Sequence, residues 1–123
     1  MIQYRDDAKV TAEEAIDLYI RSTLGERRPI DNKETFEAML KNANLTITAW
    51  DQGKLIGISR SLTDFAYVTY LADLAVDQEY QRMGIGKELI AQTVIHVVFL
   101  LSALAIAYCD TLMTKAQQQA HKH

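Results

Sequence analysis

Two glycines separated by one residue, Gly84 and Gly86, limit the possible folds of this 123-residue sequence more than any other feature. They follow an apolar segment with strand character that ends at Val76, and they precede a segment of helical composition. Glycines at the start of a helix let successive backbone N–H groups point into one concavity, where the helix dipole favours a phosphate. Arg82 and Lys87 add positive charge nearby. The pattern predicts an α/β chain with a phosphate site between a strand and a helix.

Two common phosphate-binding motifs do not fit these residues. A P-loop needs Ser or Thr after its Gly-Lys pair, whereas Gly86-Lys87 is followed by Glu88, which would repel a phosphate. The dinucleotide fingerprint needs a third glycine where this sequence has Leu89, and an acidic residue about 20 positions later, where the sequence is apolar. The residues therefore argue against a nucleoside triphosphatase and against a Rossmann-type site.

The remaining chain changes from helical to strand periodicity. Thr11 followed by two acids predicts the start of a first helix that ends near Gly25, and Asp31 or Asn32 can cap a second helix. Alternating apolar residues on both sides of a turn at 51–54 predict a hairpin. The expected elements are helices at about 11–25, 31–44 and 86–96, and strands at about 45–50, 55–62 and 67–76.

An almost wholly apolar stretch runs from Val97 to Cys109. It falls short of the roughly 18 uninterrupted apolar residues that a membrane helix needs, so we expect no membrane span. The stretch instead predicts a short buried strand at about 97–102, followed by a helix from about Ala103 into a polar tail.

The segment Gln81-Arg82-Met83-Gly84-Ile85-Gly86, behind a strand that ends in Leu74-Ala75-Val76, resembles motif A of the GNAT acetyltransferases, which bind acetyl-coenzyme A. Upstream segments at 24–29, 43–45, 48–51 and 55–65 look like those of small bacterial GNAT proteins, so that the likeness covers about residues 1–90. The element order of the family is strand, two helices, hairpin, strand and helix, and we expect the same order here. It implies the GNAT acyl-CoA N-acyltransferase fold, in which helices flank a mixed central sheet. We expect one domain over residues 1–123, with motif A at about 70–90.

The resemblance also implies how the cosubstrate acetyl-CoA is held. Backbone groups of the strand would bind the pantetheine arm, and backbone amides of the loop would bind the pyrophosphate. The expected reaction is direct transfer of the acetyl group to a primary amine of a small molecule. The residues assigned to the cofactor are Leu74, Ala75 and Val76 on the strand, and Gln81, Arg82, Met83, Gly84, Ile85, Gly86 and Lys87 on the loop and helix.

Two residues are candidates for proton transfer. Asp73 is an acid within an apolar strand, where burial would raise its pKa toward the range of a general base; alternatively it bonds to neighbouring backbone or points outward. Many GNAT enzymes have a glutamate where this chain has Ala72, which leaves a water-relayed base as another possibility. The segment that ends at Tyr108 resembles the one that supplies the family's thiolate proton donor; alternatively, Tyr108 is a core or interface aromatic.

The sequence departs from the family at about 97–123. Family members continue with a Gly-Phe turn and two terminal strands, so the final strands are expected to be missing or replaced here, by shortening or by a shifted reading frame. An uncovered sheet edge would favour a homodimer. The alternative function is a coenzyme A-binding protein with lost or altered catalysis that acts through this dimer interface.

Composition excludes several other partners. The formal charge of −3 without a basic stripe argues against nucleic acid. The single Cys109 cannot form an intrachain disulfide, which favours the cytoplasm, and no Cys/His spacing predicts a metal site. The acceptor amine is not specified by the residues, although Arg27, Arg28 and Arg60 either contact an acidic acceptor or are solvated or paired. His96 and Trp50 are expected to have structural roles.

Overall fold

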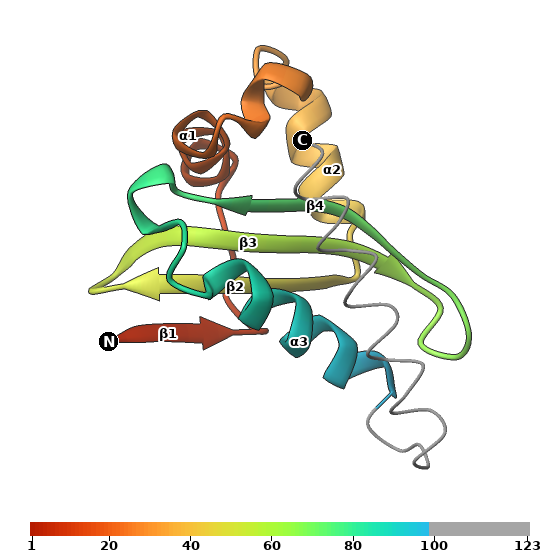
Figure 1. Cartoon of the computed structure of the whole chain (residues 1–123). Helices are drawn as coiled ribbons and strands as arrows, with labels where there is room; N and C mark the ends of the chain where they lie inside the picture. Colours follow the sequence, from red (N-terminus) through yellow and green to blue (C-terminus); the bar gives the residue numbers. More distant parts are fainter. Residues whose placement is uncertain (99–123) are drawn as a thin grey trace.

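An antiparallel sheet of four strands lies at the centre of the computed structural model, which describes residues 1–98 (Figure 1). The strand order is β1-β2-β3-β4, so that β1 and β4 form the two edges. The strands are β1 (Ile2–Arg5), β2 (Leu45–Asp51), β3 (Lys54–Thr63) and β4 (Thr69–Val76); the α-helices are α1 (Ala12–Ser22), α2 (Lys33–Asn42) and α3 (Ile85–Val98); and the 3-10 helices are η1 (Leu24–Arg27) and η2 (Gln78–Tyr80).

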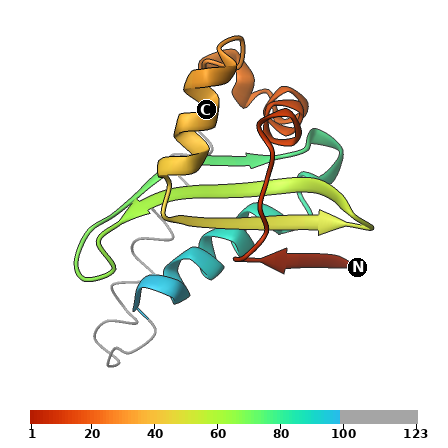
Figure 2. The ribbon, with the colours of Figure 1, turned by 180° about the vertical axis from the view of Figure 1, so that it is seen from behind.

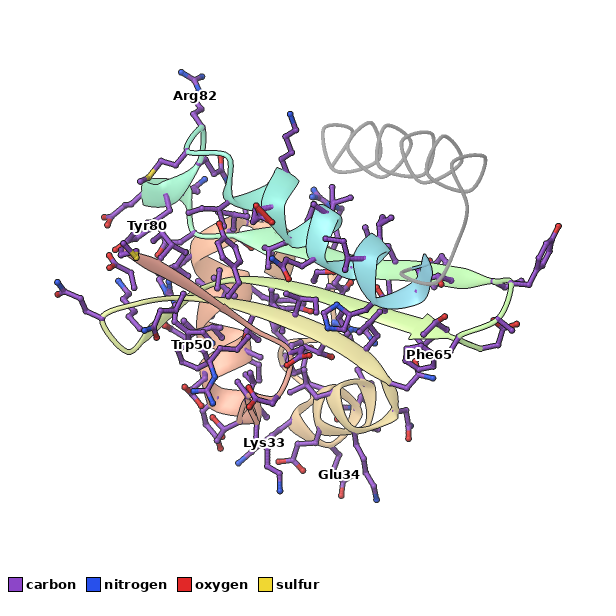
Figure 3. All side chains as sticks on the ribbon, turned by 90° about the horizontal axis from the view of Figure 1, so that it is seen from below. Lys33, Glu34, Trp50, Phe65, Tyr80 and Arg82 are labelled. Carbon is purple, nitrogen blue, oxygen red and sulfur yellow. The ribbon has the colours of Figure 1, made fainter. Side chains whose placement is uncertain are left out.

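Helices cover both faces of the sheet, as the views from behind and from below show (Figures 2 and 3). On one face, Leu18, Tyr19 and Phe36 of α1 and α2 pack against β3 and β4. On the other face, Ile85 and Leu89 of α3 pack against β2 and β3. The result is a three-layer arrangement in which the strands are buried from both sides.

The helices begin where their capping residues predict. Thr11 accepts a hydrogen bond from the Glu14 amide, and the Glu14 carboxylate accepts one from the Thr11 amide, which forms a capping box at the start of α1. Asn32, rather than Asp31, caps α2. Helix α1 ends before the predicted Gly25, because Thr23 adopts a left-handed backbone with φ of 72° and the chain continues as the 3-10 helix η1.

A β-bulge interrupts the pairing of β3 and β4. Arg60 lies opposite Asp73, but the next residue, Ser61, lies opposite Leu71, so that Ala72 is the extra residue on β4. Gly57 of β3 allows this strand to pack closely against α3. A Cβ atom at position 57 would lie 3.1 Å from Leu89 Cδ1 and 3.2 Å from Ile85 Cγ2.

The elements follow the predicted order, with two corrections. Strand β4 begins at Thr69 instead of about Tyr67, because Asp64 accepts backbone N–H bonds from residues 66–68 and holds them in a loop. The predicted strand at about 97–102 is wrong at its start, since Val97 and Val98 continue α3. The rest of the strand predicted up to 102, and the helix expected from Ala103, lie outside the described residues. Within residues 1–98, no helix is long and apolar enough to cross a membrane.

Candidate functional site

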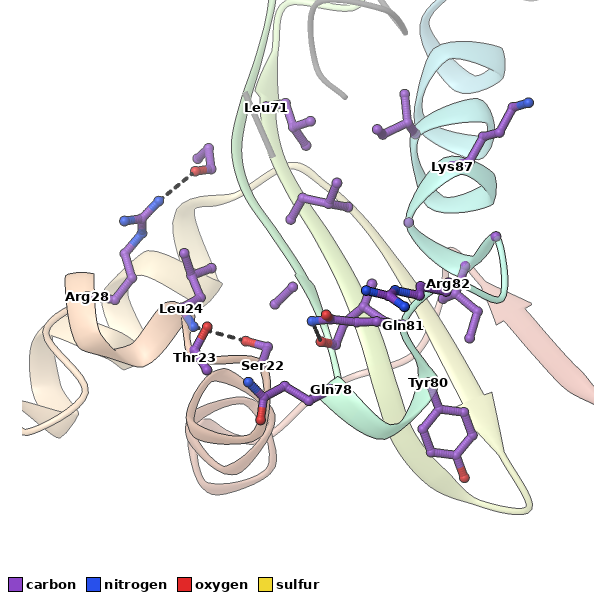
Figure 4. Close-up of a pocket in the computed structure, with 18 of the residues that line it drawn as sticks. Ser22, Thr23, Leu24, Arg28, Leu71, Gln78, Tyr80, Gln81, Arg82 and Lys87 are labelled. Atoms are coloured by element: carbon purple, nitrogen blue, oxygen red, sulfur yellow. Dashed lines mark hydrogen bonds between the residues drawn. The ribbon is translucent and has the colours of Figure 1, made fainter. Parts of the chain in front are cut away.

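An open groove of about 790 Å³ runs along β4, between the end of α1 with η1 on one side and the start of α3 on the other (Figure 4). All of the predicted cofactor-binding residues line it except Met83, whose side chain is exposed. The charged residues in its wall, within the described part of the chain, are Arg27, Arg28, Arg82 and Lys87. A groove with this lining favours an anionic ligand.

The loop between β4 and α3 presents unused backbone donors to this groove. Within residues 1–98, the backbone N–H groups of residues 82–87 have no hydrogen-bond acceptor, whereas the Gln81 amide bonds to the Gln78 carbonyl and the Glu88 amide to the Gly84 carbonyl. The first N–H groups of any helix lack acceptors within the helix. Here the N–H groups of the preceding loop residues also lack acceptors, which lengthens the row of free donors. Consecutive free N–H groups at a helix N-terminus form a site that fits a phosphate.

Glycine is favoured at positions 84 and 86 for different structural reasons. Gly84 has φ of 81°, a left-handed conformation that a side chain would strain. Gly86 lies in the first turn of α3, and a Cβ atom there would meet Val76 Cγ2 at 3.8 Å and Leu74 Cδ2 at 3.9 Å, which are ordinary contacts. Glycine at position 84 therefore avoids backbone strain, and glycine at position 86 leaves space beside the loop.

The start of this loop is anchored to the rest of the sheet. The Asp77 amide donates to the Ile56 carbonyl at 2.9 Å, and the Asp77 carboxylate accepts from Arg21 of α1 and from the Glu79 amide. Burial would raise the pKa of Asp77, but the Glu79 amide and Arg21 outweigh it and lower this pKa. The Tyr80 hydroxyl donates to Asp51 at 2.7 Å. These bonds hold η2, and with it the start of the loop, against β2, β3 and α1.

The outer edge of β4 offers backbone groups for a strand-like ligand. Because the Asp77 amide bonds to Ile56 of β3, alternation along an antiparallel strand turns the backbone of Ala75 toward β3 and that of Leu74 and Val76 toward the groove. The Val76 carbonyl accepts from the side-chain amide of Gln81 at 3.1 Å. The prediction that Ala75 also offers its backbone to the ligand is wrong for this reason.

Asp73 lies at the centre of a buried polar cluster and is itself 2% exposed. Its Oδ1 accepts from Arg28 Nε at 2.6 Å, and its Oδ2 accepts from Arg60 Nε at 2.6 Å and from the Tyr19 hydroxyl at 2.7 Å. Arg28 also donates to the Arg27 and Ala72 carbonyls, and Arg60 to the Met39 carbonyl. We call Tyr19, Arg28, Arg60 and Asp73 the arginine cluster.

The arginine cluster reverses the pKa shift expected for Asp73. Burial by itself would raise the pKa, as the sequence analysis assumed, but hydrogen bonds from Arg60, Tyr19 and Arg28 outweigh it and lower the pKa below 3.8. Burial and the adjacent carboxylate raise the pKa of Tyr19, so this phenol stays protonated. The prediction of a raised Asp73 pKa is wrong, and so is the alternative that Asp73 bonds only to backbone or points outward.

The arginine cluster was not predicted from the sequence. Tyr19 was not a candidate site residue. The alternative of paired arginines is confirmed for Arg28 and Arg60, although their common partner was not predicted. The available signal was an acid, Asp73, and an arginine, Arg60, each within a predicted strand. Tyr108, the other catalytic candidate, lies outside the described residues.

His96 and Trp50 have the structural surroundings that were expected. His96 contacts the Gln92 carbonyl at 2.6 Å and the Asp6 carboxylate at 2.8 Å, which raises its pKa above 6.5. The Trp50 indole packs against the core on the α1 face and donates to the Thr48 hydroxyl. Within residues 1–98, no group of three or more His, Cys, Asp or Glu side chains is placed to hold a metal ion.

Comparison with solved structures finds the same fold in several acetyltransferases. SA2161, a probable acetyltransferase from meticillin-resistant Staphylococcus aureus, is 28% identical with a TM-score of 0.64, over 75% of this chain and 65% of that one. SP0256, a GNAT family protein from Streptococcus pneumoniae, is 26% identical with a TM-score of 0.65, over 79% and 68%. The aminoglycoside acetyltransferase meta-AAC0020 from an uncultured soil metagenomic sample, solved with sisomicin, is 27% identical with a TM-score of 0.59, over 78% and 69%.

This chain thus spans about two thirds of the length of these proteins. Comparison with curated proteins gives no match. The family model described as the acetyltransferase (GNAT) family matches residues 12–122, which include the groove, the loop and the arginine cluster. The chain belongs to the GNAT acetyltransferase family.

Proposed function

We propose that this protein is an N-acetyltransferase that moves the acetyl group of acetyl-CoA to a primary amine of a small molecule. The observation that carries the proposal is the row of backbone N–H groups at residues 82–87, which has no acceptor within residues 1–98 and opens onto the groove. A diphosphate supplies the acceptors that these donors lack.

The same groove fits the remainder of the carrier. Leu74 and Val76 turn backbone groups toward its outer edge, where an amide-bearing arm adds to the sheet as a further strand. Arg82 and Lys87 contribute positive charge on the diphosphate side, as the close-up shows (Figure 4). We propose that these four residues, with the free amides of the loop, hold acetyl-CoA.

The bound thioester supplies an acyl group that is already activated toward amines. In the proposed reaction, the neutral amine nitrogen attacks the thioester carbonyl carbon, a C–N bond forms and the C–S bond breaks. The nitrogen gives one proton to solvent and the departing thiolate takes one up, so that the products are an N-acetyl amine and free coenzyme A. No covalent intermediate on the protein is needed.

Asp73 takes part in this reaction as a positioning residue. Its carboxylate holds Arg28 and Arg60, and a pKa below 3.8 leaves it without a proton affinity useful near neutral pH. Amine deprotonation is therefore assigned to solvent, in line with a water-relayed base. Tyr108 is retained from the sequence analysis as the proposed proton donor to the thiolate.

The relative that was solved with sisomicin supports a small-molecule amine as the acceptor class. A cytoplasmic location and a homodimer remain predictions from the sequence. Light scattering coupled to size-exclusion chromatography tests the second, because a dimer is expected at micromolar protein concentration and a monomer would contradict it.

Thiol release from acetyl-CoA tests the proposed function. The purified chain is mixed with acetyl-CoA and a panel of amines that includes amino acids, polyamines and aminoglycosides, and free thiol is followed with a colorimetric reagent. We expect at least one amine to raise the rate above hydrolysis, with the acetylated amine identified by mass spectrometry. Binding of acetyl-CoA without any amine-dependent release would contradict the enzyme and favour a coenzyme A-binding protein.

A further inference from the structure

Arg28, from the arginine cluster, lines the groove beside Ala72, away from the loop at residues 81–87. We call this loop, which we propose binds the diphosphate, the phosphate loop. The Arg28 side chain is 24% exposed, whereas Asp73 beneath it has no exposed side-chain surface. Figure 4 shows Arg28 reaching toward β4 from the η1 side, while Arg82 and Lys87 lie on the side of the loop and α3. The two cationic regions thus face the groove from different sides of β4.

The spacing along β4 assigns Arg28 to the acceptor region. Arg28 donates to the Ala72 carbonyl, and the phosphate loop follows Val76. Four residues of extended strand span about 13 Å. The groove surface between these points is formed mainly by the apolar side chains of Leu74 and Ala75 and by Leu71. Arg28 is therefore too far along the strand to serve the diphosphate site of the proposed function.

The arginine cluster carries one uncompensated positive charge. Arg28 and Arg60 are cations, Asp73 is an anion and Tyr19 is neutral, since burial raises its pKa. Within residues 1–98, Asp73 is the one acid that either guanidinium contacts, and no Asp or Glu lines the groove. A partly buried cluster with two cations and one anion favours an anionic ligand on its open side.

The remaining donors of Arg28 suit a carboxylate. A guanidinium has five N–H groups, of which Arg28 uses one at Nε for Asp73, one at Nη1 for the Arg27 carbonyl and one at Nη2 for the Ala72 carbonyl. Among residues 1–98, one N–H on each terminal nitrogen has no acceptor. The guanidinium therefore keeps a donor for each of the two oxygens of a carboxylate.

We propose that the acceptor carries a carboxylate as well as its primary amine, as an amino acid does, and that Arg28 binds this carboxylate at the end of the groove. The inference rests on the proposed function and names its substrate class. Asp73 and Tyr19 act as positioning residues, because they fix the guanidinium that contacts the substrate. An acceptor with several amines and no acid meets an unfavourable charge in the described groove.

Calorimetric titration with matched ligands tests this inference. Each common L-amino acid, β-alanine and 4-aminobutyrate is titrated beside its carboxamide, with spermidine as the polyamine, onto the chain with and without coenzyme A. We expect at least one acid to bind about 10- to 100-fold more tightly than its amide, the range for a lost hydrogen bond to a charged group. Spermidine is expected to bind more weakly than that acid.

Two variants separate the proposed contact from general charge effects. Arg28→Gln is expected to reduce the acid-over-amide preference to less than about threefold and to leave the affinity for coenzyme A unchanged. Arg5→Gln removes an exposed arginine of β1 and is expected to keep the preference. If Arg28→Gln fails to fold, the comparison of acid and amide binding to the unmodified chain still tests the preference for a carboxylate.

The outcomes distinguish the two proposals. Equal binding of acid and amide, tighter binding of the amide or of spermidine, no binding of any acid, or an unchanged preference in Arg28→Gln would overturn the carboxylate site. If the unmodified chain binds an acid more tightly than its amide but does not bind coenzyme A, the result would instead count against the proposed acetyltransferase.

Discussion

The two ends of the groove are built in opposite ways. The phosphate loop consists of backbone N–H groups from consecutive residues, 82–87, which have no acceptor among the described residues. The arginine cluster consists of side chains from α1, β3, β4 and the turn after η1, and most of its polar atoms already have partners. A local, open site can be changed with little effect on folding, whereas an assembled, buried site supports the fold and the ligand together.

The largest effect should come from breaking the assembled site with Asp73→Asn. The substitution leaves one buried and one partly buried guanidinium group near each other without their common anion, and we expect the free energy of unfolding to fall by about 3–5 kcal/mol at neutral pH. Urea unfolding followed by circular dichroism measures it. Asp17→Asn, at an exposed carboxylate, is the control and should change stability by less than about 0.5 kcal/mol.

The pH dependence of this difference has a defined sign. Because the folded-state pKa of Asp73 is lowered, its contribution is fully present above the ordinary value of 3.8 and is lost as the pH falls through the folded-state value. The gap between the unmodified chain and Asp73→Asn should therefore close below about pH 4. A gap that stays constant down to pH 3, or that is under about 1 kcal/mol at neutral pH, would contradict the account of the cluster.

The next largest effect should come from the open site through Gly86→Ala. The added methyl group meets only ordinary contacts, and alanine favours a helix, so the melting temperature should not fall. The methyl group occupies space beside the free amides, and the affinity for coenzyme A should fall by about 10-fold or more. Gly53→Ala, in the β2–β3 turn at φ of 82°, is the matched control: it should lower stability and leave the affinity unchanged.

A smaller effect is expected from Arg82→Gln. Arg82 lines the groove on the side of the loop and α3 and is exposed to solvent, so its charge is well screened. The dissociation constant for coenzyme A should rise by about 2- to 5-fold at low salt, and the difference should shrink as salt is added. An equal loss at low and high salt would show that Arg82 acts by shape and not by charge. Arg5→Gln serves as the charge control again.

The smallest effect should come from an exposed ion pair that lies outside both sites, His96 with Asp6. Asp6 raises the pKa of His96 above 6.5, with the Gln92 carbonyl as the second cause. The stabilisation is therefore present below that value and is lost as the pH rises through the folded-state pKa. Asp6→Asn should lower the melting temperature slightly at about pH 6 and leave it unchanged at about pH 9; a larger loss at the higher pH would contradict this assignment.

The contrast between the two ends also explains what could be predicted from the sequence. The strand, loop and helix around Gly84 and Gly86 depend on neighbours in the chain, so these elements were predictable from the sequence; the binding of a phosphate there stays a prediction. The capped helix starts and the hairpin were predictable for the same reason. The order of strands, helices and the groove follows from these local patterns together with the family resemblance.

The arginine cluster could not be predicted from residues that are neighbours in the sequence. The Tyr19 hydroxyl and the Asp73 carboxylate that it contacts are 54 positions apart in sequence, and their contact depends on how α1 packs on the sheet. The bulge at Ala72 determines which β4 side chains face α1. A one-residue change of register cannot be predicted from the sequence of an apolar strand. The sign of the Asp73 pKa shift followed from these partners, because burial alone predicts the opposite direction.

Backbone amide NMR with coenzyme A tests the central claim most directly. In a 15N-labelled sample, titration with coenzyme A should shift the amide resonances of residues 82–87 more than any others, with saturation at one ligand per chain. Adenosine with no phosphate should leave these resonances in place, because it offers no acceptor for the free N–H groups. Absence of shifts in residues 82–87, or equal shifts with adenosine, would contradict the claim that these backbone donors hold the diphosphate.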